Sequence, residues 1–175
     1  MARVAGEIKG REEIEIAASR EDVYAFRLDC LNLPQLNPAV RNVVRVDGRA
    51  GPPAAGSTFH CDVDLVWGEC VATVQISEAE FPSLIVLDME TKLRSGRHDP
   101  DVGVRSKEVA MFSVVPNGGT RIEIELTLFP ADSVPADQLA VMQANAGAPI
   151  NVELAAMKLA LENRPEKEEE RNVEV

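Results

Sequence analysis

Residues 137–163 read DQLAVMQANAGAPINVELAAMKLALEN and form the one long helical pattern of the chain. From residue 150 onward the apolar side chains recur at intervals of four, three and four, as on one face of an amphipathic helix. They are Ile150, Leu154, Met157 and Leu161. Small side chains at residues 144–148 lead into Pro149, which removes a helical hydrogen bond. We therefore predict a long C-terminal helix that bends in its middle and leaves a hollow beside the bend.

Most of the sequence before this helix alternates between apolar and polar residues, which is typical of strands with one buried face. The predicted strands cover residues 12–18, 40–46, 57–65, 69–76, 84–91, 107–115 and 120–129. A capping box at Ser19–Asp22 predicts a helix after the first strand, and Pro116–Gly119 is typical of a hairpin turn. Strands that follow one another directly form an antiparallel sheet. We therefore predict an α+β fold in which about seven strands pack their single apolar face on the C-terminal helix.

Length and composition limit the classes of protein to which the chain can belong. We expect an extension at residues 1–10, a single domain at 11–163 and a charged tail at 164–175, because 175 residues suffice for one buried core. The net charge of −11 argues against binding to nucleic acid or to an anionic membrane surface. No apolar run is long enough to span a bilayer or to form a signal peptide. Three cysteines without a CxxC spacing fit reduced thiols, so we predict a cytoplasmic protein that does not insert into membranes.

Five short segments occur in a characteristic order within residues 11–162. They are Ile14–Tyr24, Asn37–Val40, Gly56–Phe59, Gly119–Ile122 and Glu153–Lys158. In this order they resemble the SRPBCC helix-grip superfamily, which includes START domains, birch-pollen-allergen-like proteins and polyketide-cyclase-like proteins. The resemblance implies a curved antiparallel sheet wrapped around the long C-terminal helix, with an internal cavity for hydrophobic or amphipathic molecules. It implies no particular reaction, because members include carriers, cyclases, regulators and chaperone cofactors.

The strand pattern and the resemblance together indicate which side chains line this cavity. We expect its wall to consist of Phe26, Phe59, Cys61, Val63, Trp67, Cys70, Val74, Leu87, Met89, Met111, Leu126, Met142 and Ala146. None of these side chains is charged, so the cavity would bind a ligand by removing apolar surface from water. A filled core without a cavity is the alternative. The low aromatic content of 4% and the small side chains at residues 144–148 favour the cavity.

The function that these features favour is binding or transport of a hydrophobic small molecule, lipid-like or polyketide-like, without a cofactor. One alternative is an enzyme of the polyketide cyclase or dehydratase type, in which the cavity folds a reactive chain while polar side chains move protons. The other alternative is a regulatory or co-chaperone module whose surface matters more than its cavity. Because the predicted interior is nearly free of proton-transfer groups, binding ranks first and no catalytic residue is assigned.

Polar residues on the predicted strand at 57–65 are candidates for a metal site. His60, Asp62 and Asp64 share one face, and Glu69 could lie across from them. Strand alternation also explains them as the solvent-facing partners of an apolar inner face, so we predict no metal site. Cys61 and Cys70 point inward without a charged partner, and we expect them to behave as small apolar side chains.

A polar connection at residues 92–105 contains the remaining candidates. In relatives this loop borders the cavity mouth, so the resemblance implies that Arg94, Arg97 and His98 could hold the carboxylate or phosphate head of a ligand. His98 is the one histidine that we consider for acid–base chemistry. A solvated loop without such a role is the alternative.

Apolar residues also occur on the predicted outer face of the sheet. Leu84 and Val86 on one strand, and Ala110, Phe112 and Val114 on another, would form a patch that a monomer rarely leaves exposed. We therefore predict a homodimer, or cover by another protein, through Leu84, Val86, Phe112 and Val114.

Overall fold

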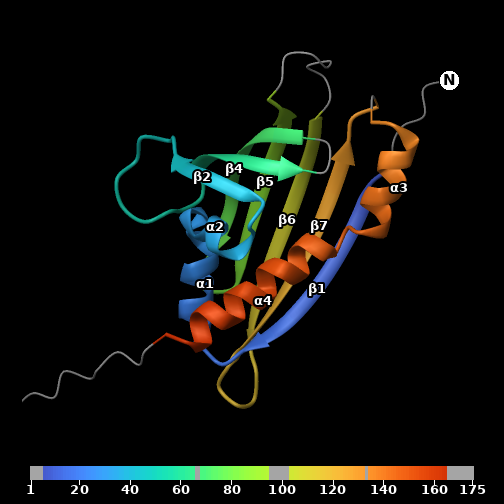
Figure 1. The fold of residues 1–175 in the computed structure, drawn as a ribbon. Helices are drawn as coiled ribbons and strands as arrows, with labels where there is room; N and C mark the ends of the chain where they lie inside the picture. The colour runs from blue at the N-terminus through green and yellow to red at the C-terminus, as the bar shows by residue number, and fades with distance from the viewer. Residues whose placement is uncertain (1–5, 66–67, 95–102, 133, 165–175) are drawn as a thin grey trace, which may run out of the picture.

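A single curved sheet organises the computed structural model, which describes residues 6–65, 68–94, 103–132 and 134–164. Within these residues seven strands pair in the order β1-β7-β6-β5-β4-β3-β2, and every pair is antiparallel. The strands are β1 (Ile8–Ile16), β2 (Val40–Arg45), β3 (Thr58–Leu65), β4 (Gly68–Glu80), β5 (Leu84–Leu93), β6 (Gly103–Val114) and β7 (Thr120–Pro130). The predicted α+β architecture, a curved antiparallel sheet around a bent C-terminal helix, is confirmed (Figure 1).

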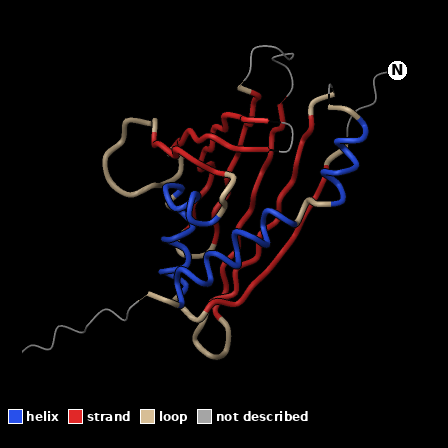
Figure 2. Tube along the Cα trace, in the orientation of Figure 1, coloured by secondary structure: helices blue, strands red, loops and turns tan. Residues whose placement is uncertain are grey.

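The helices lie on the concave side of this sheet (Figure 2). They are α1 (Arg20–Leu28), the 3₁₀ turn η1 (Cys30–Asn32), α2 (Leu33–Leu36), α3 (Ala136–Ala144) and α4 (Ala148–Glu162). The predicted cap of α1 is confirmed, because the Ser19 hydroxyl accepts a hydrogen bond from the Asp22 N–H at 3.2 Å. Helix α4 crosses the strands, α1 and α2 lie beside its C-terminal half, and α3 lies at its other end. None of the helices in the described part of the chain is both long and apolar enough to cross a membrane.

The predicted C-terminal helix is two helices joined by a tight bend. Helix α3 ends at Ala144 and α4 begins at Ala148, so the break falls within the predicted segment. Pro149 stands in the first turn of α4, where its missing N–H removes no helical hydrogen bond. The predicted apolar stripe is confirmed, since Ile150, Leu154, Met157 and Leu161 are the buried residues of α4.

The bend packs directly on β1, so the predicted hollow beside it is wrong. A Cβ atom added to Gly10 would lie only 2.7 Å from the carbonyl carbon and oxygen of Ala146. The small residues of the bend therefore allow two backbones to approach closely, and they leave no room for even a methyl group at this point. Met142 and Ala146 belong to a separate apolar cluster with Ile8 and Val134. This cluster fixes α3 over the beginning of β1.

The face of β6 that points inward is the opposite of the predicted one. Ala110 is completely buried between Ile85 and Ile124, its neighbours on the adjacent strands. Met111 is 37% exposed, so its assignment to the cavity wall is wrong. The predicted alternation, with Met111 inward and Ala110 and Phe112 outward, would also place Glu108 on the outer face. In the structure Glu108 points inward, because its carboxylate pairs with the buried guanidinium of Arg27.

Because the opposite face of β6 points inward, the predicted outer patch changes as well. Phe112 is 4% exposed and contacts Tyr24 of α1 with ring centroids 5.4 Å apart, so its assignment to the outer face is wrong. Val114 is 61% exposed at the end of β6. Leu84 and Val86 pair across the strands with Met111 and Val109, but Val86 is only 5% exposed, so its assignment to an exposed patch is wrong. A homodimer through this smaller surface remains a prediction.

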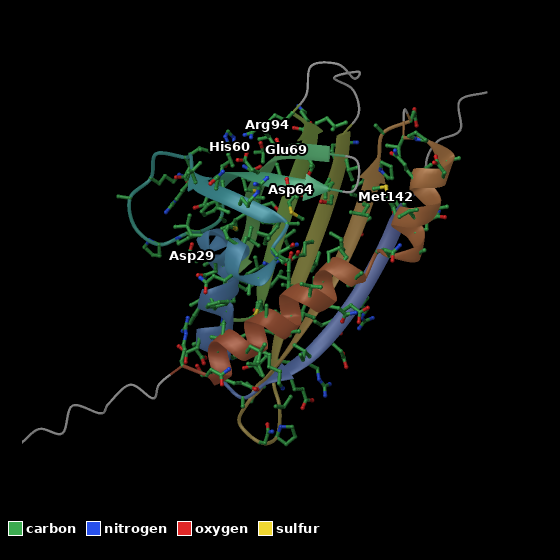
Figure 3. The ribbon with its side chains drawn as sticks, viewed as in Figure 1. Asp29, His60, Asp64, Glu69, Arg94 and Met142 are labelled. Atoms are coloured by element: carbon green, nitrogen blue, oxygen red, sulfur yellow. The ribbon has the colours of Figure 1, made fainter. Side chains whose placement is uncertain are left out.

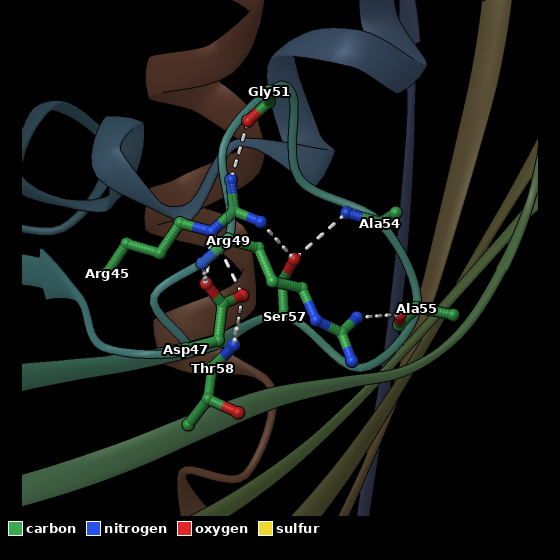
Figure 4. Close-up of polar contacts among 8 residues, drawn as sticks. All are labelled: Arg45, Asp47, Arg49, Gly51, Ala54, Ala55, Ser57 and Thr58. Carbon is green, nitrogen blue, oxygen red and sulfur yellow. Dashed lines mark hydrogen bonds and ion pairs between the residues drawn. The ribbon is translucent and has the colours of Figure 1, made fainter.

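The long loop between β2 and β3 is held by its own polar groups, away from the interior (Figure 4). Arg45 donates to the Asp47 carboxylate at 2.9 Å, to the Gly51 carbonyl at 2.6 Å and to the Ser57 hydroxyl at 2.9 Å. Burial by itself raises the pKa of Asp47, but the hydrogen bonds that its carboxylate accepts outweigh it and lower the pKa to about 2. This ionised carboxylate orders the loop.

The close approach at the bend predicts the effect of one added methyl group. Gly10→Ala should destabilise the fold by about 1–3 kcal/mol, because the methyl group would push the Ala146 backbone off β1. The control is Gly6→Ala, since nothing lies within 4 Å of the corresponding Cβ position. Urea unfolding of both variants measures the difference. Equal stability of the two variants would show that the bend is not tightly packed.

Candidate functional site

The inner face of the sheet is buried at one end and half-open at the other. Along β6 the inner side chains Val104 and Ser106 are half-buried, whereas Ala110 is fully buried. Neighbouring strands show the same change. The half-buried inner side chains at the open end, here termed the cup, are Val63, Met89, Thr91, Val104, Ser106 and Leu128. Helix α4 lies across the sheet, and α3 lies over the beginning of β1 (Figure 1).

The cup narrows to a small gap beneath α3. This gap has a volume of about 10 Å³, room for about one water molecule. It is lined by Cys70, Thr91, Leu93, Gly103, Val104, Val134 and Gln138. A larger depression of about 480 Å³ is lined mostly by outer-face residues, together with Met89 and Ser106 of the cup. Its lining consists of Thr73, Gln75, Asp88, Met89, Glu90, Arg105, Ser106 and Phe129. That depression is open to solvent and lies mainly on the polar outer surface of the sheet.

Four polar side chains meet in the interior at the floor of the cup. This floor cluster consists of Arg27, Asn37, Glu108 and Glu153. Arg27 is 2% exposed and donates from Nε and Nη2 to Glu108 Oε1, with Nε at 3.1 Å. The same Nη2 lies 3.5 Å from Glu153 Oε2. Asn37 donates from Nδ2 to Glu153 Oε1 at 3.1 Å.

Separate elements bring the floor cluster together. Glu108 is the next inner residue of β6 after Ser106, because side chains alternate along a strand. Arg27 lies one turn after Val23 on the buried face of α1. Glu153 lies one turn after Ile150 on α4. The cluster therefore ties α1 and α4 to the central strand β6.

The floor cluster contains two carboxylates and one guanidinium. Burial raises the pKa of Glu153 and the nearby Glu108 raises it further, while Arg27 and Asn37 act in the opposite direction. Burial by itself would lower the pKa of Arg27, but the two carboxylates outweigh this effect and raise it. Arg27 is therefore always charged, and Glu153 is the member of the cluster that retains its proton to higher pH than a free glutamate.

One carboxylate oxygen of the floor cluster has no partner. Glu108 Oε1 accepts both hydrogen bonds from Arg27, whereas Oε2 accepts none from the described residues. This oxygen is also not sealed off, since Arg20 Nε is the only side-chain polar atom in the described residues that is both completely buried and unpartnered. With 7% of its side chain exposed, Glu108 therefore keeps one carboxylate oxygen without a hydrogen bond from the described residues.

Cys30 lies near Arg27 and Glu108, and Cys61 lies near Cys30. Burial raises the pKa of Cys30 to about 12 and that of Cys61 to about 11. A thiol with such a pKa stays neutral at pH 7 and is a poor nucleophile. Both cysteines are therefore apolar packing residues, in agreement with the expectation for Cys61.

The structure places the predicted wall residues in several environments. Phe26, Phe59, Cys61, Cys70, Val74, Leu87 and Leu126 are buried on the inner side. Val63 and Met89 belong to the cup. Met142 and Ala146 pack in the cluster beneath α3, and Met111 faces outward. Trp67 lies outside the described residues.

Arg94 of the predicted mouth and the candidate metal ligands lie near one another at the end of β5 (Figure 3). Arg94 donates to Asp62 at 2.6 Å, and Arg41 donates to Asp64 at 2.7 Å. Glu69 lies 3.7 Å from the same guanidinium of Arg41. These carboxylates are thus partners of arginine on the surface. Arg97 and His98 lie outside the described residues.

Comparisons with known proteins concern the fold rather than the sequence. No protein-family model matches the chain, and no curated protein sequence matches it. A START superfamily protein from Mycobacterium smegmatis is 18% identical, with a TM-score of 0.64 over 90% of this chain and 98% of that protein. The structure of Ara h 8.0201 is 14% identical, with a TM-score of 0.55 over 87% of this chain and 99% of that one. The chain has the same helix-grip fold as these structures.

A further helix-grip structure is the di-domain ARO/CYC protein StfQ from the steffimycin biosynthetic pathway. It is 12% identical, with a TM-score of 0.62, and the likeness covers 90% of this chain and 52% of StfQ. At such identities these structures establish a shared fold and no activity. The function of this helix-grip chain has to be argued from its own cup and floor cluster.

The floor cluster is the part of the site that sequence reasoning missed. Glu108 looked like a solvent-facing strand residue, and Arg27 was not assigned to the buried face of its helix. The available signal was that Arg27 stands four residues after Val23, on the same helix face. A charge on a buried helix face requires an opposite charge nearby, which no pattern within one element can supply.

The raised pKa of Glu153 predicts a pH-dependent stability. The folded state keeps this proton at pH values where the unfolded chain, with a pKa near 4.5, has lost it, so Glu153 lowers stability as the pH rises above about 4.5. In Glu153→Gln this decline should be absent, and the stability of the variant relative to wild type should increase with pH. Urea unfolding from pH 4.5 to 8 tests this, with the exposed Glu78→Gln as control. Parallel profiles for wild type and Glu153→Gln would contradict it.

Proposed function

We propose that the chain binds a hydrophobic small molecule, lipid-like or polyketide-like, in the cup. The observation that supports this most directly is the decrease in side-chain burial along the inner face of the sheet. Val104 and Leu128 are half-buried, whereas Ala110 and Ile124 on the same strands are fully buried. A ligand that covered the apolar walls would gain about 25 cal/mol for each Å² removed from water.

The fold neighbours are consistent with this proposal. One is named as a START superfamily protein, and another as an ARO/CYC protein of a biosynthetic pathway. Helix-grip proteins of both kinds place a concave sheet opposite a C-terminal helix, as this chain does. Free buried cysteines and a net charge of −11 fit a cytoplasmic binding protein.

A reaction of the cyclase or dehydratase type is the second candidate, and the floor cluster favours it. The interior was predicted to be nearly free of proton-transfer groups, but it contains Glu108 and Glu153 beside Arg27. A buried carboxyl whose pKa is raised holds its proton to higher pH than a free glutamate and can donate it to a ligand. Binding ranks first because it needs only the cup, whereas a reaction also needs a reactive ligand placed against these groups.

Filling the cup should abolish binding. Ser106→Phe places an aromatic ring among the half-buried inner side chains and should weaken binding of the fluorescent probe 8-anilinonaphthalene-1-sulfonate at least tenfold. Lys107→Phe is the matched control, because Lys107 is the next residue of β6 and is exposed on the outer face. Fluorescence titration measures affinity and stoichiometry, and circular dichroism verifies that both variants fold.

Wild type should bind one probe molecule per chain. If Lys107→Phe weakens binding as much as Ser106→Phe does, the probe binds outside the cup. If the folded wild-type protein binds no probe, the proposed function is wrong.

A further inference from the structure

We infer, on the basis of the proposed function, that the floor cluster recognises the polar end of the ligand. It selects an amphipathic molecule whose polar end donates hydrogen bonds, a hydroxyl or a protonated amine, over one that ends in a carboxylate. The apolar part of the ligand lies against the walls of the cup. Its polar end reaches Glu108 and Glu153.

The first support is the free acceptor of Glu108. This side chain is more than nine-tenths buried, and its Oε2 has no hydrogen-bond partner in the described residues. A buried polar atom without a partner is costly, so such atoms are normally satisfied by protein, water or ligand. Oε2 is not completely sealed, and Glu108 directly follows Ser106 of the cup on the inner face. A ligand in the cup can therefore reach it.

The second support is the charge balance. Both donor positions that Arg27 uses in the cluster are directed at carboxylates, Nε at Glu108 and Nη2 at Glu108 and Glu153. One guanidinium thus serves two carboxylates, so the cluster carries an excess of negative charge when both carboxylates are ionised. A third carboxylate at this point would be repelled in a medium of low dielectric constant. A donor group would instead supply the missing hydrogen bond or charge.

The geometry around Glu153 argues against a purely structural role. A clamp between α1 and β6 needs only Arg27 and Glu108. Glu153 lies 3.5 Å from Arg27 Nη2, too far for a strong hydrogen bond, and its other oxygen is held by Asn37 at 3.1 Å. A second buried carboxylate with such loose pairing adds desolvation cost without a matching gain in packing. Its position is useful if a donor group joins the cluster.

Three ligands of equal chain length test the selection: 1-decanol, decylamine and decanoate. Isothermal titration calorimetry of the full chain at pH 7 measures each affinity. Wild type should bind decanol and decylamine at least tenfold more tightly than decanoate, as expected for one hydrogen bond to a charged group. Glu153→Gln keeps the Arg27–Glu108 pair and the Asn37 contact. This variant should bind decylamine about tenfold more weakly and decanoate more tightly than wild type does.

Glu108→Gln should change the preference in the same direction, and Glu153→Gln keeps the inference testable if Glu108→Gln fails to fold. Glu78→Gln, at an exposed position of β4, is the control and should leave all three affinities unchanged. Decanoate binding to wild type as tightly as decylamine would overturn the inference. So would an unchanged order of affinities in Glu153→Gln, which would leave the cluster as a structural clamp while the proposed function stands. If none of the three ligands binds to wild type, the proposed function fails as well.

Discussion

The buried contact between Arg27 and Glu108 is the interaction on which the arrangement of the interior depends. A lone charge is not tolerated inside a protein, and removing one partner of a buried pair typically costs about 3–5 kcal/mol. The contact therefore fixes α1 against β6. It also sets the face of β6 that points inward, so that Ala110 and Phe112 enter the core while Met111 faces solvent. Glu153 extends the same constraint to α4.

The shape of the cup follows from a second constraint, the close packing of the bend on β1. Because Gly10 has no side chain, the Ala146 backbone lies against it and α3 stays over the beginning of β1. The buried side chains of α4 pack in one core cluster with Ala110 and Ile124. The inner residues Met89, Val104 and Ser106 remain half-buried. Two local contacts thus produce an interior that is filled at one end and open at the other.

The Arg27–Glu108 contact and the packing of the bend on β1 together give the cup an apolar wall and a polar floor. A chain selected only for stability would fill this position with apolar side chains, because a buried ion pair rarely stabilises a fold more than well-packed hydrophobic residues do. Departures from such local rules are commonly found at functional sites. The helix-grip fold supplies the concave space, and the residues of this chain decide what the space can hold.

The alternation of residues along strands and the spacing along helices were sufficient to predict the antiparallel sheet, the Ser19 cap and the buried stripe from Ile150 to Leu161. Each of these features depends on residues within a single helix or strand. The regular spacing of those residues makes the feature visible in the sequence. The inner face of β6 could not be predicted in this way, since both of its faces contain apolar residues. Only the tertiary structure places Arg27 against Glu108, eighty-one positions away along the chain, and only that neutralising contact allows a carboxylate to point inward. The sequence by itself therefore determined the sheet and the bent helix, whereas the polar floor of the cup was decided by contacts between distant segments, because the burial of a charge depends on its partner in space.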